Sequence, residues 1–177
     1  MSSSEERQKL LPETSDIKEV YQHELHLRGV PYSFAEHFIV ALSNPQQLSD
    51  KDINILYNAC DVGINTCVGE GFGLCNLEHA CLGKPQIISN VGALGDIFRN
   101  DYSTLINPVG EYYITNSIDF HGGYMKICNS DDFTDALIKY FDNRELLEKH
   151  GSLAREEITT KYEWKNILNT IYFYYDL

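Results

Sequence analysis

A short run in the middle of the chain, residues 68–84 (VGEGFGLCNLEHACLGK), most constrains how this sequence can fold. Its glycines, Gly69, Gly71 and Gly73, permit backbone conformations with positive φ and let a ligand approach the main chain closely. The residues after them have the apolar spacing of a helix, whose first N–H groups lack intrahelical partners and lie at the positive end of the helix dipole. A glycine turn followed by a helix is an arrangement with which proteins hold an anion.

Two glutamates in the same run, Glu70 and Glu78, are separated by seven residues. Glu78 falls inside an otherwise apolar helical segment, where a carboxylate needs a reason to be present. Without its flanks, the run also fits a plain strand-to-helix turn with two solvated surface acids. Both interpretations stay open on the run alone.

Helix-like and strand-like segments alternate every ten to fifteen residues through most of the chain. The expected strands are short and apolar, and turn residues bound them. They cover residues 38–42, 61–65, 85–89 and 103–107. This alternation is typical of an α/β domain with a Rossmann-like, doubly wound parallel sheet, in which ligands bind at the carboxyl ends of the strands.

The helices are expected from the spacing of apolar residues. The first begins at Asp16 and stops before Gly29, and the second should bury Ile53, Leu56 and Tyr57. A third follows the glycine run, and a short fourth follows a turn.

The last third of the chain begins with residues 108–129, where the alternation dissolves. We expect a long surface loop there, or a small hairpin around residues 111–115. Three helices should follow, and Asn143 can cap the second of them. The apolar face expected on the first is Phe133, Ala136, Leu137, Tyr140 and Phe141. The residues expected to be buried on the last are Ile167, Leu168 and Ile171.

The charge balance excludes two classes of partner. The chain has 14 Lys and Arg residues against 26 Asp and Glu, a net charge of −12. Such a surface disfavours general binding to nucleic acid or to anionic lipid. No apolar run approaches the roughly 20 residues of a membrane-spanning helix, so no direct membrane span is expected. A bound phosphate must then be held locally, by main-chain amides and a few cations.

The five cysteines are an odd number and form no C-x-x-C pair, so a disulfide framework is not expected. The polar, acidic start of the chain is unlike a signal or transit peptide. We therefore expect a reducing, cytoplasmic location. Residues 1–15 are expected to form a flexible leader, and residues 16–177 a single domain.

Two candidate metal sites are weak. The Asp50-Lys51-Asp52 triplet resembles a D-x-D metal-binding motif, but aspartates in a first helical turn already have a role as caps and dipole partners. A zinc site built from the irregularly spaced cysteines and His79 is also disfavoured, because buried free thiols are common in α/β cores. No metal ligand is assigned.

Several segments together resemble the donor-binding half of the family 4 retaining glycosyltransferases, which have the GT-B fold. The spacing of Glu70 and Glu78 matches that family's E-x7-E signature. The other matching segments are Leu56–Asp61, Glu70–Leu74, Gly83–Pro85, Ile88–Ser89, Val91–Gly92, Ser130–Asp142 and Tyr162–Trp164. The resemblance covers residues 36–176. The amino-acid sequence of the matching segments is most similar to glycosyltransferases of large DNA viruses of algae and protists.

The resemblance implies a role for each part of the glycine run. Glu78 would bind the ribose hydroxyls of a UDP-, GDP- or ADP-sugar, and Glu70, the catalytic candidate, would lie against the donor sugar near its anomeric carbon. The base would lie over the turn near Leu42 and Ser43. The donor-binding turn and amides would be those of Gly71, Phe72, Gly73, Leu74 and Cys75. No cofactor or essential metal is implied.

The sequence also departs from the family pattern. Cys67 replaces a serine, and His79 replaces an alanine that usually follows the second glutamate. The family's amino-terminal acceptor-binding Rossmann domain has no counterpart here, nor has the Arg/Lys pair that grips the diphosphate, for which Lys84 and Arg99 are only candidates. If the last helix crosses to such a domain, as in the family, Tyr172, Phe173 and Tyr175 are expected to be exposed.

The predicted function is therefore donor binding in a retaining glycosyltransferase that transfers a hexose to an acceptor hydroxyl, with the acceptor domain supplied in cis or in trans. One alternative is a non-catalytic nucleotide-sugar-binding subunit that needs a separate acceptor-binding chain. Another is an enzyme, such as an epimerase or phosphorylase, that uses the same donor fold.

Overall fold

The computed structural model describes residues 17–31, 48–115 and 123–175. The chain forms two units, residues 1–49 and 50–177. The expected leader and the expected strand at 38–42, with Leu42 and Ser43 at its end, lie outside the described residues.

The described part of the first unit is helix α2, Ile17–Leu27. It stops where the sequence predicts, because Gly29 has φ 70° and the N–H of Val30 turns back to the carbonyl of Leu25 at 2.9 Å. A glycine with positive φ after the last turn is a common helix C-cap.

The second unit is built on a parallel sheet. Its strands are β1 (Gly63–Asn65), β2 (Gln86–Ser89) and β3 (Thr104–Ile106), hydrogen-bonded in the order β1-β2-β3. The register aligns Ile64 with Ile87 and Ile88 with Leu105. The α/β class and parallel sheet predicted from the sequence are confirmed.

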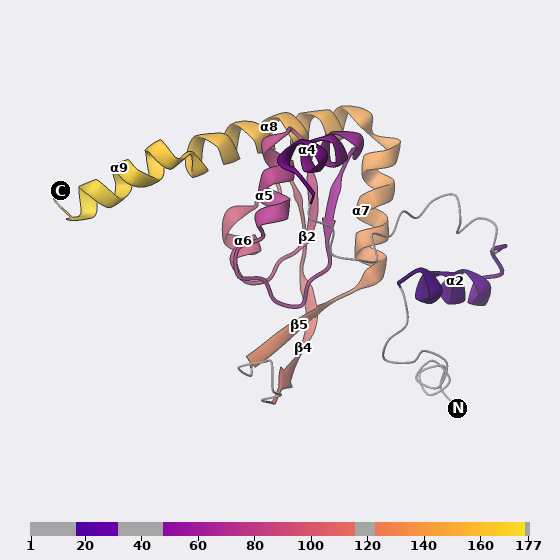
Figure 1. The fold of residues 1–177 in the computed structure, drawn as a ribbon. Helices are drawn as coiled ribbons and strands as arrows, with labels where there is room; N and C mark the ends of the chain where they lie inside the picture. Colours follow the sequence, from indigo (N-terminus) through magenta and orange to yellow (C-terminus); the bar gives the residue numbers. More distant parts are fainter. Residues whose placement is uncertain (1–16, 32–47, 116–122, 176–177) are drawn as a thin grey trace. The chain divides into compact units, whose positions relative to one another are not determined.

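Helices cover both faces of this sheet (Figure 1). The described helices of this unit are α4 (Asp50–Ala59), α5 (Leu74–Cys81), α6 (Ala93–Ile97), α7 (Ser130–Asp142), α8 (Arg144–Tyr162) and α9 (Trp164–Tyr175). Because successive side chains of a strand point to opposite faces, Ile88 packs in a core with α5, α6 and α8, whereas Ile87 packs in a second core with α7. The central strand β2 is buried throughout, as expected for a parallel sheet covered on both sides.

Of the two alternatives expected for residues 108–129, a long surface loop or a small hairpin, the structure shows a hairpin. Strands β4 (Pro108–Ile114) and β5 (Gly123–Cys128) pair antiparallel and are longer than the hairpin expected around residues 111–115. Cross-strand pairs hold them, including the Tyr113 and Tyr124 rings with centroids 5.1 Å apart. The N–H of Lys126 also donates to the carbonyl of Val68 at 2.8 Å, which ties the hairpin to the start of the glycine run.

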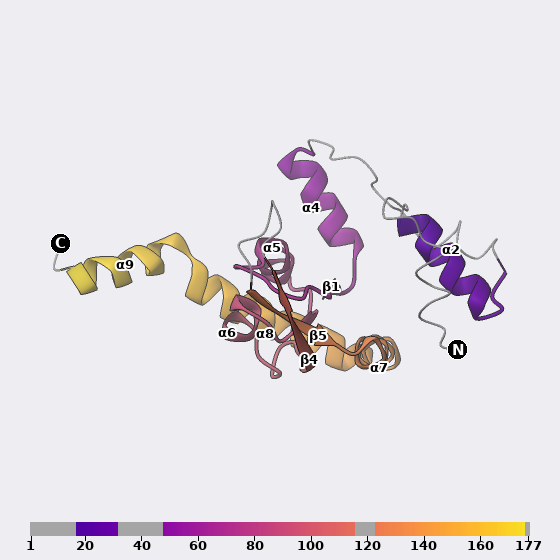
Figure 2. The same cartoon turned by 90° about the horizontal axis from the view of Figure 1, so that it is seen from below.

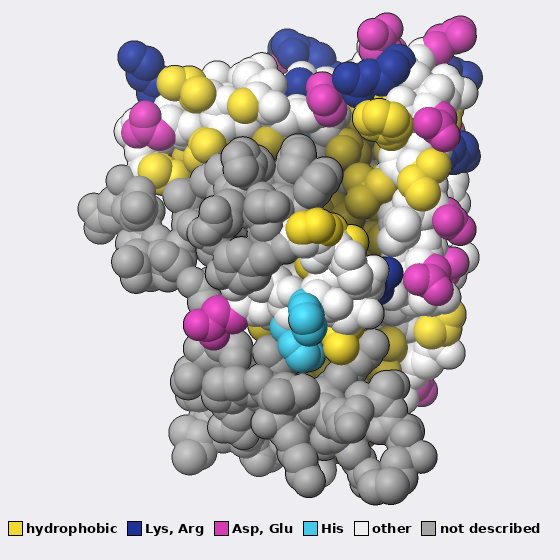
Figure 3. Space-filling view, turned by 90° about the vertical axis from the view of Figure 1, so that its right-hand side faces the viewer, with side chains coloured by type: hydrophobic (Ala, Val, Ile, Leu, Met, Phe, Trp, Pro, Cys, Tyr) yellow, Lys and Arg dark blue, Asp and Glu magenta, His cyan; other side chains and the backbone are white. Residues whose placement is uncertain are grey.

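The burial predictions for α4 and α7 are partly wrong. On α4, Leu56 is 44% exposed, and Ile53 and Tyr57 are only half-buried. On α7, Leu137 is 38% exposed and Phe141 is 79% exposed, while Phe133, Ala136 and Tyr140 are buried as predicted. The apolar stripe of α7 is wider than the sheet surface that covers it, so its outer edge borders a cavity of about 290 Å³ instead of a core. Figure 3 views the molecule from this side and shows hydrophobic side chains gathered around a hollow.

The predictions for the last helix divide in the same way. Tyr172 and Phe173 are exposed as expected, and the side chain of Tyr175 lies outside what the structure describes. Leu168 and Ile171, each 42% exposed, are not buried. Figures 1 and 2 show the reason, since α9 extends past the end of α8 and away from the sheet. The predicted cap of α8 is confirmed, because the side-chain oxygen of Asn143 accepts a hydrogen bond from the N–H of Leu146 at 2.9 Å. No helix in the described ranges is both long and apolar enough to cross a bilayer.

We expect Gly151→Ala to lower the free energy of unfolding by about 1 to 3 kcal/mol through overpacking. A Cβ at Gly151, in the middle of α8, would lie 2.1 Å from the carbonyl oxygen of Gly83 at the end of α5. The direction of this change in the free energy of unfolding is informative, because alanine is otherwise favoured over glycine within a helix by about 1 kcal/mol. The neighbouring exposed Ser152 provides the control, and Ser152→Ala should be neutral or slightly stabilising in urea unfolding. Equal stability of the two variants would contradict this close helix contact.

Candidate functional site

The glycine run forms a tight turn at the carboxyl end of β1, packed against the turn that follows β2. Gly73 has φ 80° and precedes α5, and a Cβ there would lie 2.4 Å from Cδ2 of Leu94, which is completely buried. Gly92 has φ 51°, and a Cβ there would lie 2.1 Å from the carbonyl oxygen of Glu70. The N–H of Ala93 donates to that same oxygen at 3.3 Å. The backbone of Glu70 is thus held between the two turns.

The carboxylate of Glu70 folds back onto the turn. Its Oε1 accepts hydrogen bonds from the N–H groups of Phe72 at 3.2 Å and Gly73 at 3.1 Å. The family resemblance assigned these two amides to donor binding. In this structure they already donate hydrogen bonds to the chain's own Glu70 carboxylate. The second oxygen, Oε2, makes neither bond.

The next amides belong to the first turn of α5. The first intrahelical bond runs from the N–H of Leu77 to the carbonyl of Gly73 at 3.0 Å, and Gly73 supplies no capping side chain. The N–H groups of Leu74 and Cys75 therefore point out of the helix end, where the dipole favours an anion. The side chains of both residues are exposed. Gly71 lies in open space, because a Cβ there would meet no atom within 4 Å.

Glu78 lies one turn further along α5 with its side chain exposed. Its Oε2 accepts a hydrogen bond from the hydroxyl of Tyr57 on α4 at 3.0 Å. Burial, and then hydrogen bonds to Cys75 and Glu78, raise the pKa of Tyr57, so the hydroxyl remains a donor at neutral pH. A cavity of about 340 Å³ lies beside this pair. Its lining is Asp50, Ile53, Asn54, Tyr57, Leu77, Glu78, Cys81 and Leu82.

His79, the next residue of α5, points the other way and is only 5% exposed. Its Nε2 lies 3.0 Å from the carbonyl oxygen of Tyr57, and its Nδ1 lies 3.2 Å from Nε2 of Gln86. Because a carbonyl only accepts and an amide nitrogen only donates, the tautomer is assigned with the proton on Nε2. Burial lowers the pKa of His79, which favours this neutral form.

A buried chain of amides continues from Gln86 toward the glycine run. Oε1 of Gln86 accepts from Nδ2 of Asn76 at 2.9 Å, and Oδ1 of Asn76 accepts from Nδ2 of Asn65 at 2.7 Å. Oδ1 of Asn65 then accepts from the N–H of Cys67 at 2.9 Å. Sequence reasoning missed this network, although a glutamine and an asparagine in otherwise apolar strands were a usable signal.

Other sequence candidates lie elsewhere or are engaged. Arg99 pairs with Asp101 and Glu157, each at 3.1 Å, and Nζ of Lys84 donates to the carbonyl of Asn58 at 3.3 Å. Among the described residues, no three His, Cys, Asp or Glu side chains gather as a metal site would require.

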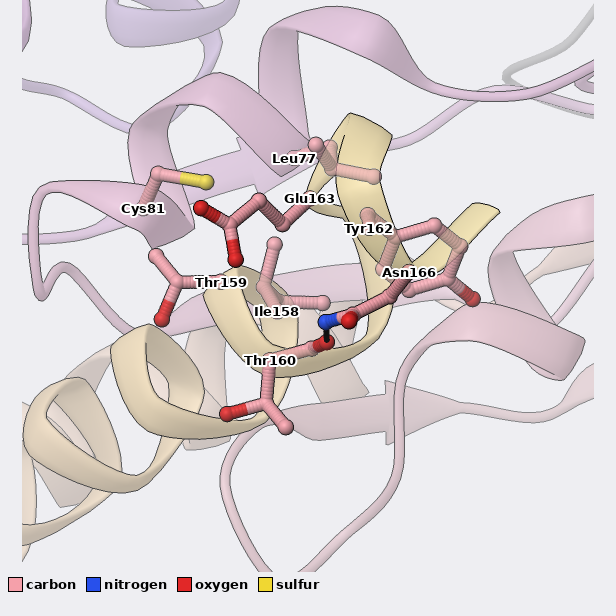
Figure 4. Close-up of a pocket in the computed structure, with 8 residues that line it drawn as sticks. All are labelled: Leu77, Cys81, Ile158, Thr159, Thr160, Tyr162, Glu163 and Asn166. Carbon is pink, nitrogen blue, oxygen red and sulfur yellow. Dashed lines mark hydrogen bonds between the residues drawn. The ribbon is translucent and has the colours of Figure 1, made fainter. Parts of the chain in front are cut away.

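A larger cavity, of about 560 Å³, lies between α5, the end of α8 and the start of α9 (Figure 4). Its lining is Leu77, Cys81, Ile158, Thr159, Thr160, Tyr162, Glu163 and Asn166. It does not include Glu78, whereas Glu78 lines the smaller cavity, so the smaller cavity is the better candidate for a ligand.

Comparisons with known proteins bear on the family and the fold of the chain. The sequence profile of the family "Glycosyl transferases group 1" matches residues 39–157. The fold is similar to a sucrose-phosphate synthase from Thermosynechococcus elongatus, at 18% identity and a TM-score of 0.61 over 94% of this chain and 36% of that one. It is also similar to the C-terminal domain of a group 1 glycosyl transferase (LpcC) from Francisella tularensis, at 20% identity and a TM-score of 0.54 over 81% of this chain and 63% of that one. This chain thus spans less than two thirds of either structure. No curated sequence is significantly similar to it.

We expect Gly73→Ala to destabilise the chain by about 2 to 4 kcal/mol, from left-handed strain together with overpacking against Leu94. Gly71→Ala in the same turn is the matched control, and its effect should stay within about 0.5 kcal/mol because the added methyl meets open space. Thermal and urea unfolding measure both variants. Equal losses at the two positions would show that the turn is not built as described.

Proposed function

Because the chain belongs to the group 1 glycosyl transferases, we propose that it binds the nucleotide-sugar donor of a retaining enzyme that transfers a hexose to an acceptor hydroxyl. One observation carries the proposal. The glycine turn with Glu70 follows the carboxyl end of β1, and the uncapped first turn of α5 and then Glu78 come directly after that turn. This is where open α/β sheets bind ligands.

The distances along α5 suit a nucleoside diphosphate. At about 1.5 Å per residue, Glu78 lies about 6 Å along the helix axis from Leu74. A diphosphate at the N–H groups of Leu74 and Cys75 would place the ribose diol beside the carboxylate of Glu78, which can accept two O–H bonds. The 340 Å³ cavity then lies on the α4 side of the ribose. The proposed base contacts at Leu42 and Ser43 lie outside the described residues.

Glu70 is proposed to face the donor sugar. Its Oε1 is held by the amides of Phe72 and Gly73, so the carboxylate has a fixed position from which Oε2 can accept a sugar hydroxyl. A fixed negative charge there would stabilise the positive charge that develops at the anomeric carbon as the phosphate departs. The helix dipole would stabilise that phosphate, and no metal is included in the proposal.

An acceptor-binding Rossmann domain, in cis or in trans, is proposed as the partner. Four aromatic side chains described on α9 are exposed, Trp164 at 74%, Tyr172 at 50%, Phe173 at 80% and Tyr174 at 77%, and an apolar surface of this kind suits a protein partner. The same surface fits the alternative, a non-catalytic donor-binding subunit of a separate acceptor-binding chain.

The donor proposal predicts that the chain binds at least one of UDP, GDP and ADP. Glu78→Ala should weaken that binding at least about tenfold, the usual scale for losing hydrogen bonds to a charged acceptor. Glu148→Ala, which removes an exposed acid from α8, should leave the affinity unchanged. Isothermal calorimetry in the presence of a chelator measures all three chains. Absence of binding at millimolar nucleotide, or an unaffected Glu78→Ala chain, would refute the donor site.

The partner proposal predicts slow transfer by the isolated chain, because bringing two substrates together supplies much of the rate of such reactions. Adding a candidate acceptor-binding domain should raise the rate of sugar transfer from a radiolabelled donor. The double variant Phe173→Ser, Tyr174→Ser should abolish that gain while nucleotide binding is kept. Fast transfer by the isolated chain would contradict the proposal.

A further inference from the structure

Glu78 is not a free surface acid, because Tyr57 reaches it from a different helix. The Tyr57 hydroxyl donates to Oε2 of Glu78 at 3.0 Å. Tyr57 is half-buried near the end of α4, whereas Glu78 is exposed on α5. The bond therefore fixes the carboxylate relative to a second element, and it engages only one of the two carboxylate oxygens.

Tyr57 is in turn held by His79. The two rings stack with centroids 5.2 Å apart and an angle of 29° between their planes. The protonated Nε2 of His79 also donates to the carbonyl oxygen of Tyr57 at 3.0 Å. Ring and main chain of Tyr57 are thus both fixed by the residue that follows Glu78. Since consecutive helical residues point about 100° apart, one can face a ligand while the next faces the core.

Gln86 holds His79 from the other side. Its Nε2 donates both to Nδ1 of His79 at 3.2 Å and to the carbonyl of Lys84 at 3.0 Å. Gln86 is completely buried on β2, and its Oε1 packs against the bare main chain of the opposing Gly63, where a Cβ would lie only 2.1 Å away. The orientation of His79 is therefore set by the centre of the sheet.

We propose that His79 and Tyr57 are positioning residues of the donor site, which hold Glu78 in the orientation that binds the ribose. His79 fixes Tyr57, the Tyr57 hydroxyl occupies Oε2 of Glu78, and Oε1 is presented to the ribose diol. The carboxylate is ordered before the nucleotide arrives, so less rotamer freedom is lost on binding. This inference rests on the proposed function, because it concerns how the same carboxylate recognises its ligand.

A positioning role for Tyr57 can be told apart from a general structural role, because only the former affects how well the site distinguishes a nucleotide from its 2′-deoxy form. Tyr57→Phe removes the hydroxyl but keeps the ring that stacks on His79. It should weaken nucleoside diphosphate binding by about five- to tenfold, as expected for one hydrogen bond. It should also reduce the preference for the nucleotide over its 2′-deoxy form, because the misplaced carboxylate no longer discriminates the diol. A merely structural loss would weaken both ligands by the same factor.

The experiment titrates the full chain with UDP, GDP and ADP, and then uses the one that binds best together with its 2′-deoxy form. The variants are Tyr57→Phe and His79→Ala, each made alone and each combined with Glu78→Ala. Tyr113→Phe, on the exposed hairpin, is the control. We expect reduced ribose discrimination in both single variants, no further reduction in the Glu78→Ala background, and wild-type behaviour of Tyr113→Phe. If His79→Ala does not fold, Tyr57→Phe alone decides.

Two results would overturn the inference and are distinguishable. Unchanged ribose discrimination in Tyr57→Phe, with Glu78→Ala still impaired, would refute the positioning role and leave the donor site intact. Failure of all three nucleotides to bind the wild-type chain would refute the donor site, and the positioning role with it.

Discussion

The candidate site depends on one buried amide. Gln86 is the first residue of the central strand β2 and has no exposed surface, and an unpaired polar group there would cost about 1 to 3 kcal/mol. Its three side-chain hydrogen bonds go to Asn76, His79 and the carbonyl of Lys84. Two of these partners lie on α5, the helix that carries Glu78. Satisfying Gln86 therefore also fixes the rotation of α5 about its own axis, and with it the direction in which Glu78 points.

The same network extends to both ends of the site. Through Asn76 and Asn65 it reaches the N–H of Cys67, just before the glycine turn, and through His79 it reaches Tyr57 on α4. Every described buried side-chain nitrogen or oxygen has a hydrogen-bond partner, so the network is complete within the part of the chain that the structure describes. A fully satisfied polar network rigidifies its surroundings, whereas a partly satisfied one would weaken the core.

Much of this fold could be predicted from local sequence patterns, because those patterns depend only on residues that are close together in the chain. The parallel strands, the helix stop at Gly29 and the Asn143 cap follow from apolar spacing and from the conformations that glycine and asparagine favour. Burial of Leu56, Phe141 and Leu168 was predicted wrongly, because periodicity shows that a face is apolar but not whether another element covers it. The hydrogen bond between Tyr57 and Glu78 was missed for a related reason. The two residues are 21 positions apart in the sequence and meet only after α4 and α5 pack.

The position of Glu70 limits how an anion can be held at this helix. The chain carries a net charge of −12, and Arg99 and Lys84 are engaged elsewhere, so neutral amides must provide much of the attraction within the described residues. Glu70 uses two of those amides itself. A diphosphate close to its carboxylate would meet repulsion between like charges, which weakens with distance and is smallest when the phosphates sit further along, at Leu74 and Cys75. In the proposed donor complex, the phosphates at Leu74 and Cys75 and the sugar at Glu70 would lie on opposite sides of Phe72 and Gly73. The turn that holds Glu70 would then also set the position of the sugar–phosphate bond that breaks.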